Sequence, residues 1–391
     1  MATPHITERA AGAPWLDERD FSLEDFRGQV ERDTDVTEYP HAENVRDNVL
    51  VYRASAVVHS GDRRALQAEL IRALADGPGV VVFTGAFDDE VVDRATVAFF
   101  ELIDAQRAAG QAAGDHFGTP GANDRIWNAA QKLALHDPDV FAGYYANDVL
   151  ATVCQAWLGP RFQVTSQVNV VNPGGKAQVP HRDYHLGFVP EDHLSAYPAH
   201  IHRTSPVLTL QGAVAHCDMP VETGPTMLLP HSQRFSGGYI AFNRPEFIDY
   251  FADHHVQVPL RKGDAIFFNP ALYHGAGTNS SADVRRIANL LQISSPFGRA
   301  METMDRTAMV RAVYPALLAM KAAGRDHREV ENAVVATAEG YAFPTNLDSD
   351  QPIDSLVPLS QVDIVLDALR RNLTEQELDI ALREQNERRN P

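Results

Sequence analysis

The sequence predicts an α+β fold in which a β core of jelly-roll type lies between N- and C-terminal helical flanks. Short β-rich runs separated by turn signals follow one another between residues 161 and 300. On both sides of this region, apolar residues recur at the spacing of amphipathic helices. The chain has 391 residues, 44% of them hydrophobic, so it can bury a large core without disulfide bonds.

The first part of the chain is expected to be mainly helical, with one buried strand. Residues 62–75 predict a helix that ends at a Gly-Pro-Gly break, and the β-branched run 80–84 predicts the strand. Asp88 is placed to cap the next helix. Pro138 is placed to open a further helix that continues to about residue 158.

Seven β-rich runs make up the expected core. They cover residues 162–171, 179–188, 207–216, 226–229, 256–258, 265–268 and 287–294. Helices return from about residue 301, where Ser360 with Asp363 and Thr374 with Glu377 predict capping boxes.

We expect three regions along the chain. Residues 1–48 form an N-terminal arm, residues 49–300 form one domain that contains the jelly-roll core, and residues 301–391 form a helical extension packed on the same domain. Within the domain, residues 110–128 are rich in Gly, Ala, Asp and Asn and predict a mobile loop.

The charge and composition exclude several classes of protein. The formal net charge of −18 argues against a broad nucleic-acid-binding surface. Residues 161–300 carry 11 basic and 10 acidic residues, so an anionic small molecule remains compatible with the core. There is no signal-peptide pattern and no apolar run of ~20 residues. We therefore expect a cytoplasmic protein, a monomer or homodimer, with a small-molecule substrate and neither membrane nor nucleic acid as partner.

Three residues predict a metal site. His181 and Asp183 are two positions apart on an expected strand, so their side chains point to the same face. His274, in the segment GDAIFFNPALYHGAG, is the best candidate for a third ligand from another strand. Two imidazoles and one carboxylate form a facial triad, which leaves three coordination positions open, as Fe(II) oxygenases require.

Two arginines follow the distal histidine. Arg285 stands eleven residues after His274, and Arg286 comes next, at the start of an apolar run. A buried arginine is costly unless it is paired, and its fork matches a carboxylate of a small dicarboxylic acid. The two side chains face opposite sides of one strand, so either could fill this role.

These segments resemble the phytanoyl-CoA dioxygenase family of Fe(II)/2-oxoglutarate oxygenases. The H-x-D sequence follows Asn172-Pro173-Gly174-Gly175 in the family's manner, and residues 217–234 resemble its central acidic-Gly-Pro stretch, with His231 where glycine is usual. Together with the distal histidine and the arginine eleven residues later, the resemblance extends over about residues 60–300. One departure is Ala276, which replaces the small hydroxyl residue that is common two positions after the distal histidine.

The resemblance implies a double-stranded β-helix of cupin-like, jelly-roll type and a set of roles. His181, Asp183 and His274 would bind Fe(II), and 2-oxoglutarate and O2 would be cosubstrates. Arg285 is favoured over Arg286 as the anchor of the distal carboxylate, by family spacing alone. Because Ala276 offers no hydroxyl, we expect another cosubstrate donor among three strand residues, namely Thr209, Gln167 and Asn169. Hydroxylation is the outcome expected, and the aspartate ligand disfavours halogenation.

The substrate is not specified by any motif. His185 is expected on the same strand face as the two ligands, as a substrate contact or a core residue. Arg125, Trp127 and Asn128 line the pocket in one interpretation, whereas in the other Trp127 only anchors its loop. Only four lysines occur among 34 basic residues, which suggests a GC-rich bacterial genome and a secondary metabolite as substrate.

Two other functions remain open at this point. A zinc-dependent hydrolase on a jelly-roll scaffold would use the same three ligands, but the chain has no H-E-x-x-H motif and no second ligand set. A non-catalytic binding module would not explain why two histidines, an aspartate and an arginine occur in this order.

Overall fold

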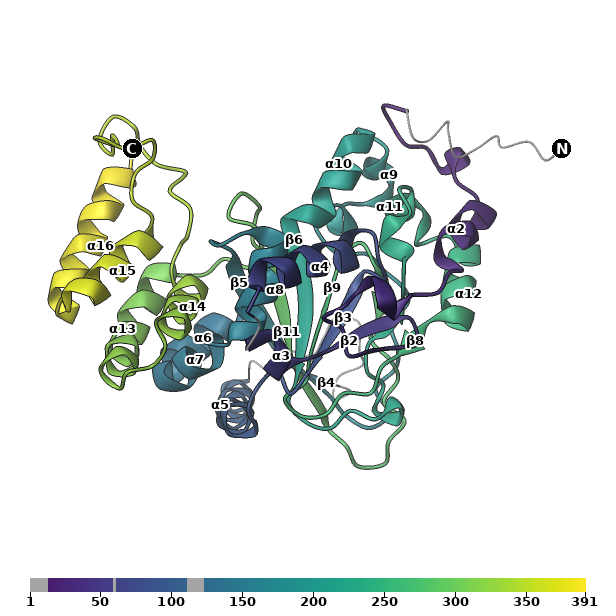
Figure 1. Ribbon diagram of the computed structural model, residues 1–391, viewed down its shortest axis with the longest axis horizontal. Coiled ribbons are helices and arrows are strands. Elements are labelled where there is room, and N and C mark those ends of the chain that lie inside the picture. The colour runs from purple at the N-terminus through teal and green to yellow at the C-terminus, as the bar shows by residue number, and fades with distance from the viewer. Residues whose placement is uncertain (1–12, 59–60, 111–122) are drawn as a thin grey trace. The chain divides into compact units, whose positions relative to one another are not determined.

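The computed structural model describes residues 13–58, 61–110 and 123–391 (Figure 1). The first twelve residues of the predicted arm and most of the predicted loop 110–128 lie outside the described residues.

The β core consists of two sheets. The larger sheet has the strand order β1-β2-β3-β9-β6-β11-β5-β4, and the smaller sheet has the order β10-β7-β8. β2 runs parallel to β3, while β3, β9 and β6 pair antiparallel. The strands are β1 (Asn44–Arg46), β2 (Val49–Arg53), β3 (Val80–Thr84), β4 (Asn123–Ile126), β5 (Gln163–Val171), β6 (Thr209–Ala215), β7 (Met227–Leu229), β8 (Val256–Gln257), β9 (Ala265–Phe268), β10 (Tyr273–Gly275) and β11 (Arg286–Ser294).

An apolar cluster joins the facing sides of the two sheets. Leu228 of the smaller sheet packs in it with Ala213, Ile266 and Ala288 of the larger sheet. The neighbours of Leu228 in β7 belong to a second cluster on the outer side of the smaller sheet. Because successive side chains of a strand point to opposite faces, this division identifies the interior of a jelly roll. The predicted α+β jelly-roll fold is confirmed.

The other regular elements are helices. They are α2 (Leu23–Val30), α3 (Ala54–Val58), α4 (Arg63–Ala75), α5 (Asp89–Ala108), α6 (Ala129–His136), α7 (Pro138–Tyr145), α8 (Asp148–Leu158), α9 (Glu191–Leu194), α10 (Ala199–Thr204), α11 (Gly238–Ala241), α12 (Pro245–His254), α13 (Arg306–Ala322), α14 (His327–Thr337), α15 (Gln361–Arg371) and α16 (Glu375–Arg389). Both predicted capping boxes are present, at the starts of α15 and α16. No helix among the described residues has the length and apolarity needed to cross a bilayer.

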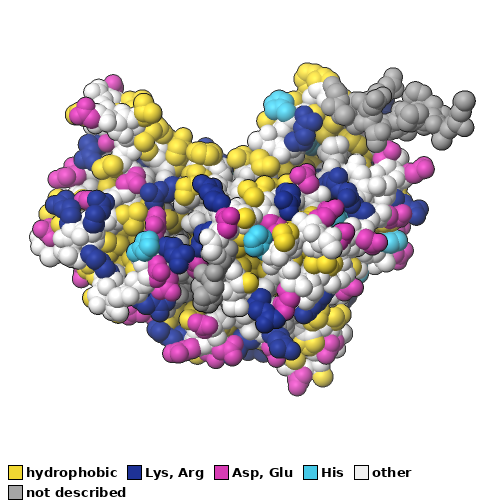
Figure 2. Space-filling view, in the orientation of Figure 1, with side chains coloured by type: hydrophobic (Ala, Val, Ile, Leu, Met, Phe, Trp, Pro, Cys, Tyr) yellow, Lys and Arg dark blue, Asp and Glu magenta, His cyan; other side chains and the backbone are white. Residues whose placement is uncertain are grey.

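The chain divides into two compact units. One comprises residues 1–86, 112–125 and 168–291, and the other comprises residues 87–111, 126–167 and 292–391. The second unit contains α5 to α8 and α13 to α16, of which α15 and α16 lie side by side near the C-terminus (Figure 1). The expected boundaries at residues 48 and 300 stay predictions. On the face shown in Figure 2, acidic and basic side chains are interspersed.

Two expected elements are wrong in detail. The single helix from Pro138 to residue 158 is two helices, α7 and α8, because the Asn147 side chain accepts a hydrogen bond from the Leu150 N–H and starts a new helix. The run 179–188 is not a strand. Pro180 has no N–H to donate, and the backbone turns at Tyr184 with φ of +35°, so pairing is limited to an isolated bridge at His181.

The described part of the N-terminal arm packs within the first unit. Phe26 of α2 is fully buried and contacts the rings of Phe235, Phe247, Tyr250 and Tyr273, with centroids 5.1 to 5.7 Å away. Accordingly, α2 lies beside α12 (Figure 1). Because Tyr273 precedes His274, the arm supports the strand that presents this histidine.

His231 shows why glycine is usual at its position. Its φ is +70°, a conformation that glycine adopts without strain, and its ring is buried. Nδ1 lies 3.0 Å from the Gly77 carbonyl oxygen and Nε2 lies 3.1 Å from the Thr34 hydroxyl. The ring therefore connects the arm to the turn before β3, and burial lowers the pKa of His231 to about 4.

Acid should destabilise the fold through His231. Since the pKa is lower in the folded state, the unfolded chain binds more protons between pH 6.5 and 4, and stability falls as pH falls through this window. We compare the wild type with His231→Gly by chemical denaturation at several pH values. Between pH 6.5 and 4, the unfolding free energy of the wild type should fall by about 2 to 3 kcal/mol more than that of the variant. Parallel pH profiles of the two proteins would contradict this result.

Candidate metal centre

Backbone pairing brings the H-x-D segment to β10. The His181 N–H donates to the His274 carbonyl oxygen at 3.0 Å, and the His274 N–H donates back at 3.3 Å. On either side, the Gln178 N–H donates to Ala276 and the Asp183 N–H donates to Pro270. Although the expected strand is absent, His181 and Asp183 still point to the same side, because this segment is extended where it passes β10.

The three predicted ligands converge on one point. One donor atom from each of His181, Asp183 and His274 lies within 4.8 Å of the others. Asp183 Oδ1 is 3.9 Å from His181 Nε2, and Asp183 Oδ2 is 3.4 Å from His274 Nε2. Donors that share one face of an ion at bond lengths of ~2.1 Å lie about 3 Å apart, so the cluster needs only small movements to bind a metal.

Both imidazoles are oriented by the backbone. His181 Nδ1 lies 3.1 Å from the Val179 carbonyl oxygen, and His274 Nδ1 lies 2.8 Å from that of Leu272. A carbonyl can only accept, so each Nδ1 carries a proton and each Nε2 faces Asp183. This orientation leaves Nε2 of both rings as the atom that can bind a metal once it has lost its proton.

Asp183 is held in its ionised form. Burial opposes ionisation, but His181 and hydrogen bonds from His274 and Gln211 outweigh it and lower the pKa of Asp183 well below its usual value. The Gln211 amide nitrogen donates to Oδ2. Sequence reasoning missed Gln211, although a glutamine inside the apolar run of β6 is a signal for a buried polar contact.

Phe268 and the three residues predicted to bind the cosubstrate are all buried. The Phe268 ring lies 4.7 Å from the His274 ring and belongs to the interior cluster. Thr209 is buried two residues before Gln211 on the same side of β6. Asn169 is also buried, on β5, and its Oδ1 has no hydrogen-bond partner among the described residues. Gln167 is buried too, and its amide contacts the Met301 sulfur. Cosubstrate roles for these three residues stay predictions.

The two arginines are placed very differently. The Arg285 side chain is 44% exposed and contacts Asp124 and Asn172 at 3.4 and 3.3 Å. Arg286 is 7% exposed and shares its strand face with Ala288 of the interior cluster. Its Nη1 donates to the carbonyl oxygens of Thr223 and Gly277, at 3.2 and 3.5 Å. Arg286 thus faces the interior, and its guanidinium contacts the backbone at Gly277, three residues after His274.

Arg286 is a buried cation without a carboxylate partner among the described residues. Burial lowers its pKa to about 10, and among the described residues no carboxylate forms an ion pair with it. A buried guanidinium that is solvated by carbonyl oxygens alone is well suited to bind an anion.

The candidate substrate residues do not form one group. His185 was expected on the strand face of the ligands, but the turn at Tyr184 ends the extended segment, and the His185 N–H donates to the Ser205 hydroxyl. Arg125 is half-buried on β4. Trp127 and Asn128 belong to the second compact unit, where Asn128 contacts Glu302 and Thr303. Substrate roles for all four residues stay predictions.

Three further histidines make contacts of a structural kind. The rings of His254 and His255 stack on Tyr250 and Phe251. His202 is buried in α10 with Nε2 3.2 Å from the Leu194 carbonyl oxygen.

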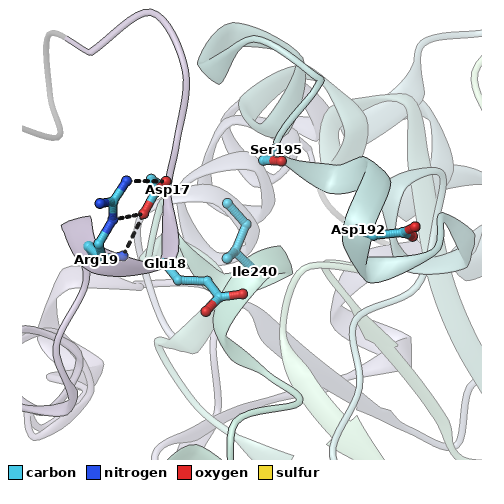
Figure 3. A pocket seen from close by; sticks show the side chains of 6 residues that line it. All are labelled: Asp17, Glu18, Arg19, Asp192, Ser195 and Ile240. Atoms are coloured by element: carbon cyan, nitrogen blue, oxygen red, sulfur yellow. Dashed lines mark hydrogen bonds and ion pairs between the residues drawn. The ribbon is translucent and has the colours of Figure 1, made fainter.

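A separate pocket of about 700 Å³ has a different character. Its lining residues, shown in Figure 3, are Asp17, Glu18, Arg19, Asp192, Ser195 and Ile240. Arg19 pairs with Asp17 at 2.8 Å, so the basic group is already neutralised. Within the described part of the chain, the only group of three metal-ligating side chains is the one formed by His181, Asp183 and His274.

A family model described as phytanoyl-CoA dioxygenase (PhyH) matches residues 75–287, more than half of the chain. The chain belongs to the phytanoyl-CoA dioxygenase family. The match covers both the H-x-D segment and His274, as well as Arg285 and Arg286, so the resemblance expected from these motifs is confirmed.

Two curated relatives of this family member are called dioxygenases. Dioxygenase cdmD of Talaromyces verruculosus is 30% identical over 151 residues, which are 36% of this chain and 45% of that protein. Dioxygenase trt7 of Aspergillus terreus (strain NIH 2624 / FGSC A1156) is 30% identical over 128 residues, 33% of this chain and 39% of that protein. The chain thus matches less than half the length of each of these relatives.

Some solved structures are similar to this chain at low sequence identity. The epimerase SnoN, solved with Fe3+, alpha ketoglutarate and nogalamycin RO, is 21% identical with a TM-score of 0.41, covering 59% of this chain and 84% of SnoN. AviO1 from Streptomyces viridochromogenes Tue57 is 17% identical with a TM-score of 0.44, covering 60% of this chain and 97% of AviO1.

Proposed function

We propose that this protein is a mononuclear non-haem Fe(II)- and 2-oxoglutarate-dependent dioxygenase that oxidises a small molecule. The observation that carries the proposal is the convergence of His181 Nε2, His274 Nε2 and the Asp183 carboxylate, with Nδ1 of each imidazole held by a backbone carbonyl oxygen. This donor set fits Fe(II) and leaves three positions for cosubstrate and oxygen. Membership of a dioxygenase family supports the same conclusion.

The protein's own groups would divide the work of binding. His181, Asp183 and His274 would hold the iron, and Gln211 would keep one carboxylate oxygen of Asp183 engaged. When bound, iron with 2-oxoglutarate and O2 supplies an oxidation that yields succinate and CO2. The product we propose is a hydroxylated substrate.

Arg286 is the arginine that we propose for the distal carboxylate of 2-oxoglutarate, in place of Arg285. It faces the same interior as His274, lacks a carboxylate partner among the described residues, and approaches Gly277, next to Ala276. An anionic cosubstrate would relieve the cost of burying this charge. Arg285 is instead engaged with Asp124. A zinc hydrolase would give this buried cation no comparable role.

We further propose a substrate with a sizeable apolar surface, such as a bacterial secondary metabolite. Three large apolar side chains are exposed on segments that adjoin the metal centre. Val179, two residues before His181, is 64% exposed, and Phe188, packed on Tyr184, is 55% exposed. Val207, two residues before Thr209, is 47% exposed. Exposed apolar side chains on the segments that lead to a site favour binding of apolar ligands.

The test is anaerobic titration of the purified protein with Fe(II) and 2-oxoglutarate. Chelation of iron by the keto acid should produce a weak visible charge-transfer band. Admission of O2 should then release succinate, even slowly and without substrate. Absence of both signals, or hydrolysis of esters by the zinc-loaded protein without O2, would contradict the proposal in favour of the hydrolase.

A further inference from the structure

Arg182 lies between two of the ligands and points away from them. The residue is 2% exposed, and its guanidinium carbon is 5.1 Å from the ring centroids of both Tyr239 and Tyr273. Nη2 donates to the carbonyl oxygens of Ser232 and Phe235 at 2.5 and 3.0 Å. A fully buried cation is therefore held between two aromatic faces and two backbone oxygens.

This cation occupies the outer side of the smaller sheet. Tyr239 and Tyr273 belong to the outer apolar cluster, whereas His274, next to Tyr273, contacts Phe268 of the interior cluster. Neighbouring residues of an extended chain point to alternate sides. Arg182 therefore fixes the segment on its outer side, while the side chains of His181 and Asp183 point to the inner side.

The contacts of Arg182 connect the two segments that supply ligands. Tyr273 directly precedes His274. The Tyr239 hydroxyl donates to the carbonyl oxygens of Asp183 and Tyr184, at 3.1 and 2.8 Å. One guanidinium thus holds the H-x-D segment and the His274 strand against the same pair of rings.

The position of the Arg182 guanidinium requires a glycine at residue 238. A Cβ added at Gly238 would lie 1.8 Å from the Arg182 guanidinium carbon. The Tyr273 hydroxyl donates to the Gly238 carbonyl oxygen, so the chain passes directly over the cation. Backbone, rings and glycine together form a built site for this one side chain.

Burying an arginine at this position costs free energy, because its charge is removed from water. Among the described residues no carboxylate forms an ion pair with Arg182, and its Nε has no hydrogen-bond partner. An apolar side chain could fill the space without a desolvation cost. The H-x-D segment, however, has few ladder hydrogen bonds of its own, so another interaction must fix its position.

We propose that Arg182 is a positioning residue that holds His181 and Asp183 in place relative to His274, so that the metal centre is preformed. This inference rests on the proposed metal centre. It assigns no contact with substrate or metal to Arg182. Its consequence is that loss of the guanidinium weakens metal binding more than it weakens the fold.

The experiment is titration of the metal-free protein with Co(II), read from the visible absorption of the bound ion, together with thermal unfolding. We compare the wild type with Arg182→Met, Arg182→Lys and the control Arg203→Met, which removes an exposed arginine of α10. Arg182→Met should keep a near-native Tm but raise the Kd for Co(II) at least tenfold and change the absorption envelope. Arg182→Lys should recover only part of the affinity, because an ammonium cannot span both rings and both oxygens.

Two outcomes would overturn the proposal. One is an Arg182→Met protein that binds Co(II) as the wild type does. The other is a loss of Tm with unchanged Kd and spectrum, which would mean a purely structural role. If Arg182→Met does not fold, the same measurements of Kd, absorption spectrum and Tm are made on Arg182→Lys and on Gly238→Ala. The added Cβ of Gly238→Ala displaces the guanidinium. Failure of the wild type itself to bind Co(II) would reject the proposed metal centre as well.

Discussion

Replacement of His181 by alanine should abolish both the Fe(II)-dependent charge-transfer band and the release of succinate. The alanine variant loses one of three ligands, and the two that remain, Asp183 and His274, cannot define a face of the coordination sphere. We expect the affinity for divalent metal to fall by more than about 100-fold, since changes merely to the partners of ligands cost 10- to 100-fold. Metal content after dialysis, measured by atomic emission, reports the loss directly.

His193→Ala is the matched control for this variant. The His193 side chain is 68% exposed on α9, and its nearest acidic partner, Asp192, is exposed as well. The control should retain metal, band and succinate release at wild-type levels. Full metal occupancy in His181→Ala would show that the ion binds elsewhere and would reject the assigned ligands.

Replacement of Arg286 by methionine should weaken 2-oxoglutarate binding by about 100-fold. A guanidinium that binds a carboxylate through two charge-assisted hydrogen bonds contributes about 3 kcal/mol relative to an apolar side chain. Iron binding should survive, because Arg286 contacts backbone oxygens and no ligand side chain. Isothermal titration with 2-oxoglutarate at saturating Mn(II), under argon, separates the two effects.

Arg285→Met is the control and also the competing hypothesis. Its side chain is exposed and paired with Asp124, so its loss should change the Kd for 2-oxoglutarate by less than threefold. If Arg285→Met loses the cosubstrate while Arg286→Met keeps it, the family spacing is the better guide and our placement of the anchor is wrong.

Much of the core could be predicted from local patterns. Six of the seven expected β runs correspond to strands, because β-branched runs bounded by turn signals are strong indicators of strands. The candidate ligand set was also visible in the sequence, since H-x-D and a distal histidine keep their order whether or not a regular ladder forms. The run 179–188 failed because its apolar residues surround Pro180 and a turn, so tertiary contacts decide its conformation.

The surroundings of the centre depend on contacts that no spacing reveals. Gln211 reaches Asp183 from β6, and only the alternation of β6 relative to the interior shows this. The choice between Arg285 and Arg286 depends on where β11 begins, which is a matter of a single residue. Arg182 stands between two ligands in the sequence, yet its partners Tyr239 and Tyr273 are more than fifty residues away.

The reciprocal pairing of His181 with His274 has a consequence for misfolded states. A slip of one residue in this short pairing would turn Arg182 toward the side of His274 and both His181 and Asp183 toward the aromatic rings. A guanidinium would then stand where a cation must bind, and a carboxylate would be buried between tyrosine faces without a partner. The alternation His-Arg-Asp therefore penalises the wrong register on both sides of the chain at once, so the segment that supplies two of the candidate ligands also disfavours its own misregistered form.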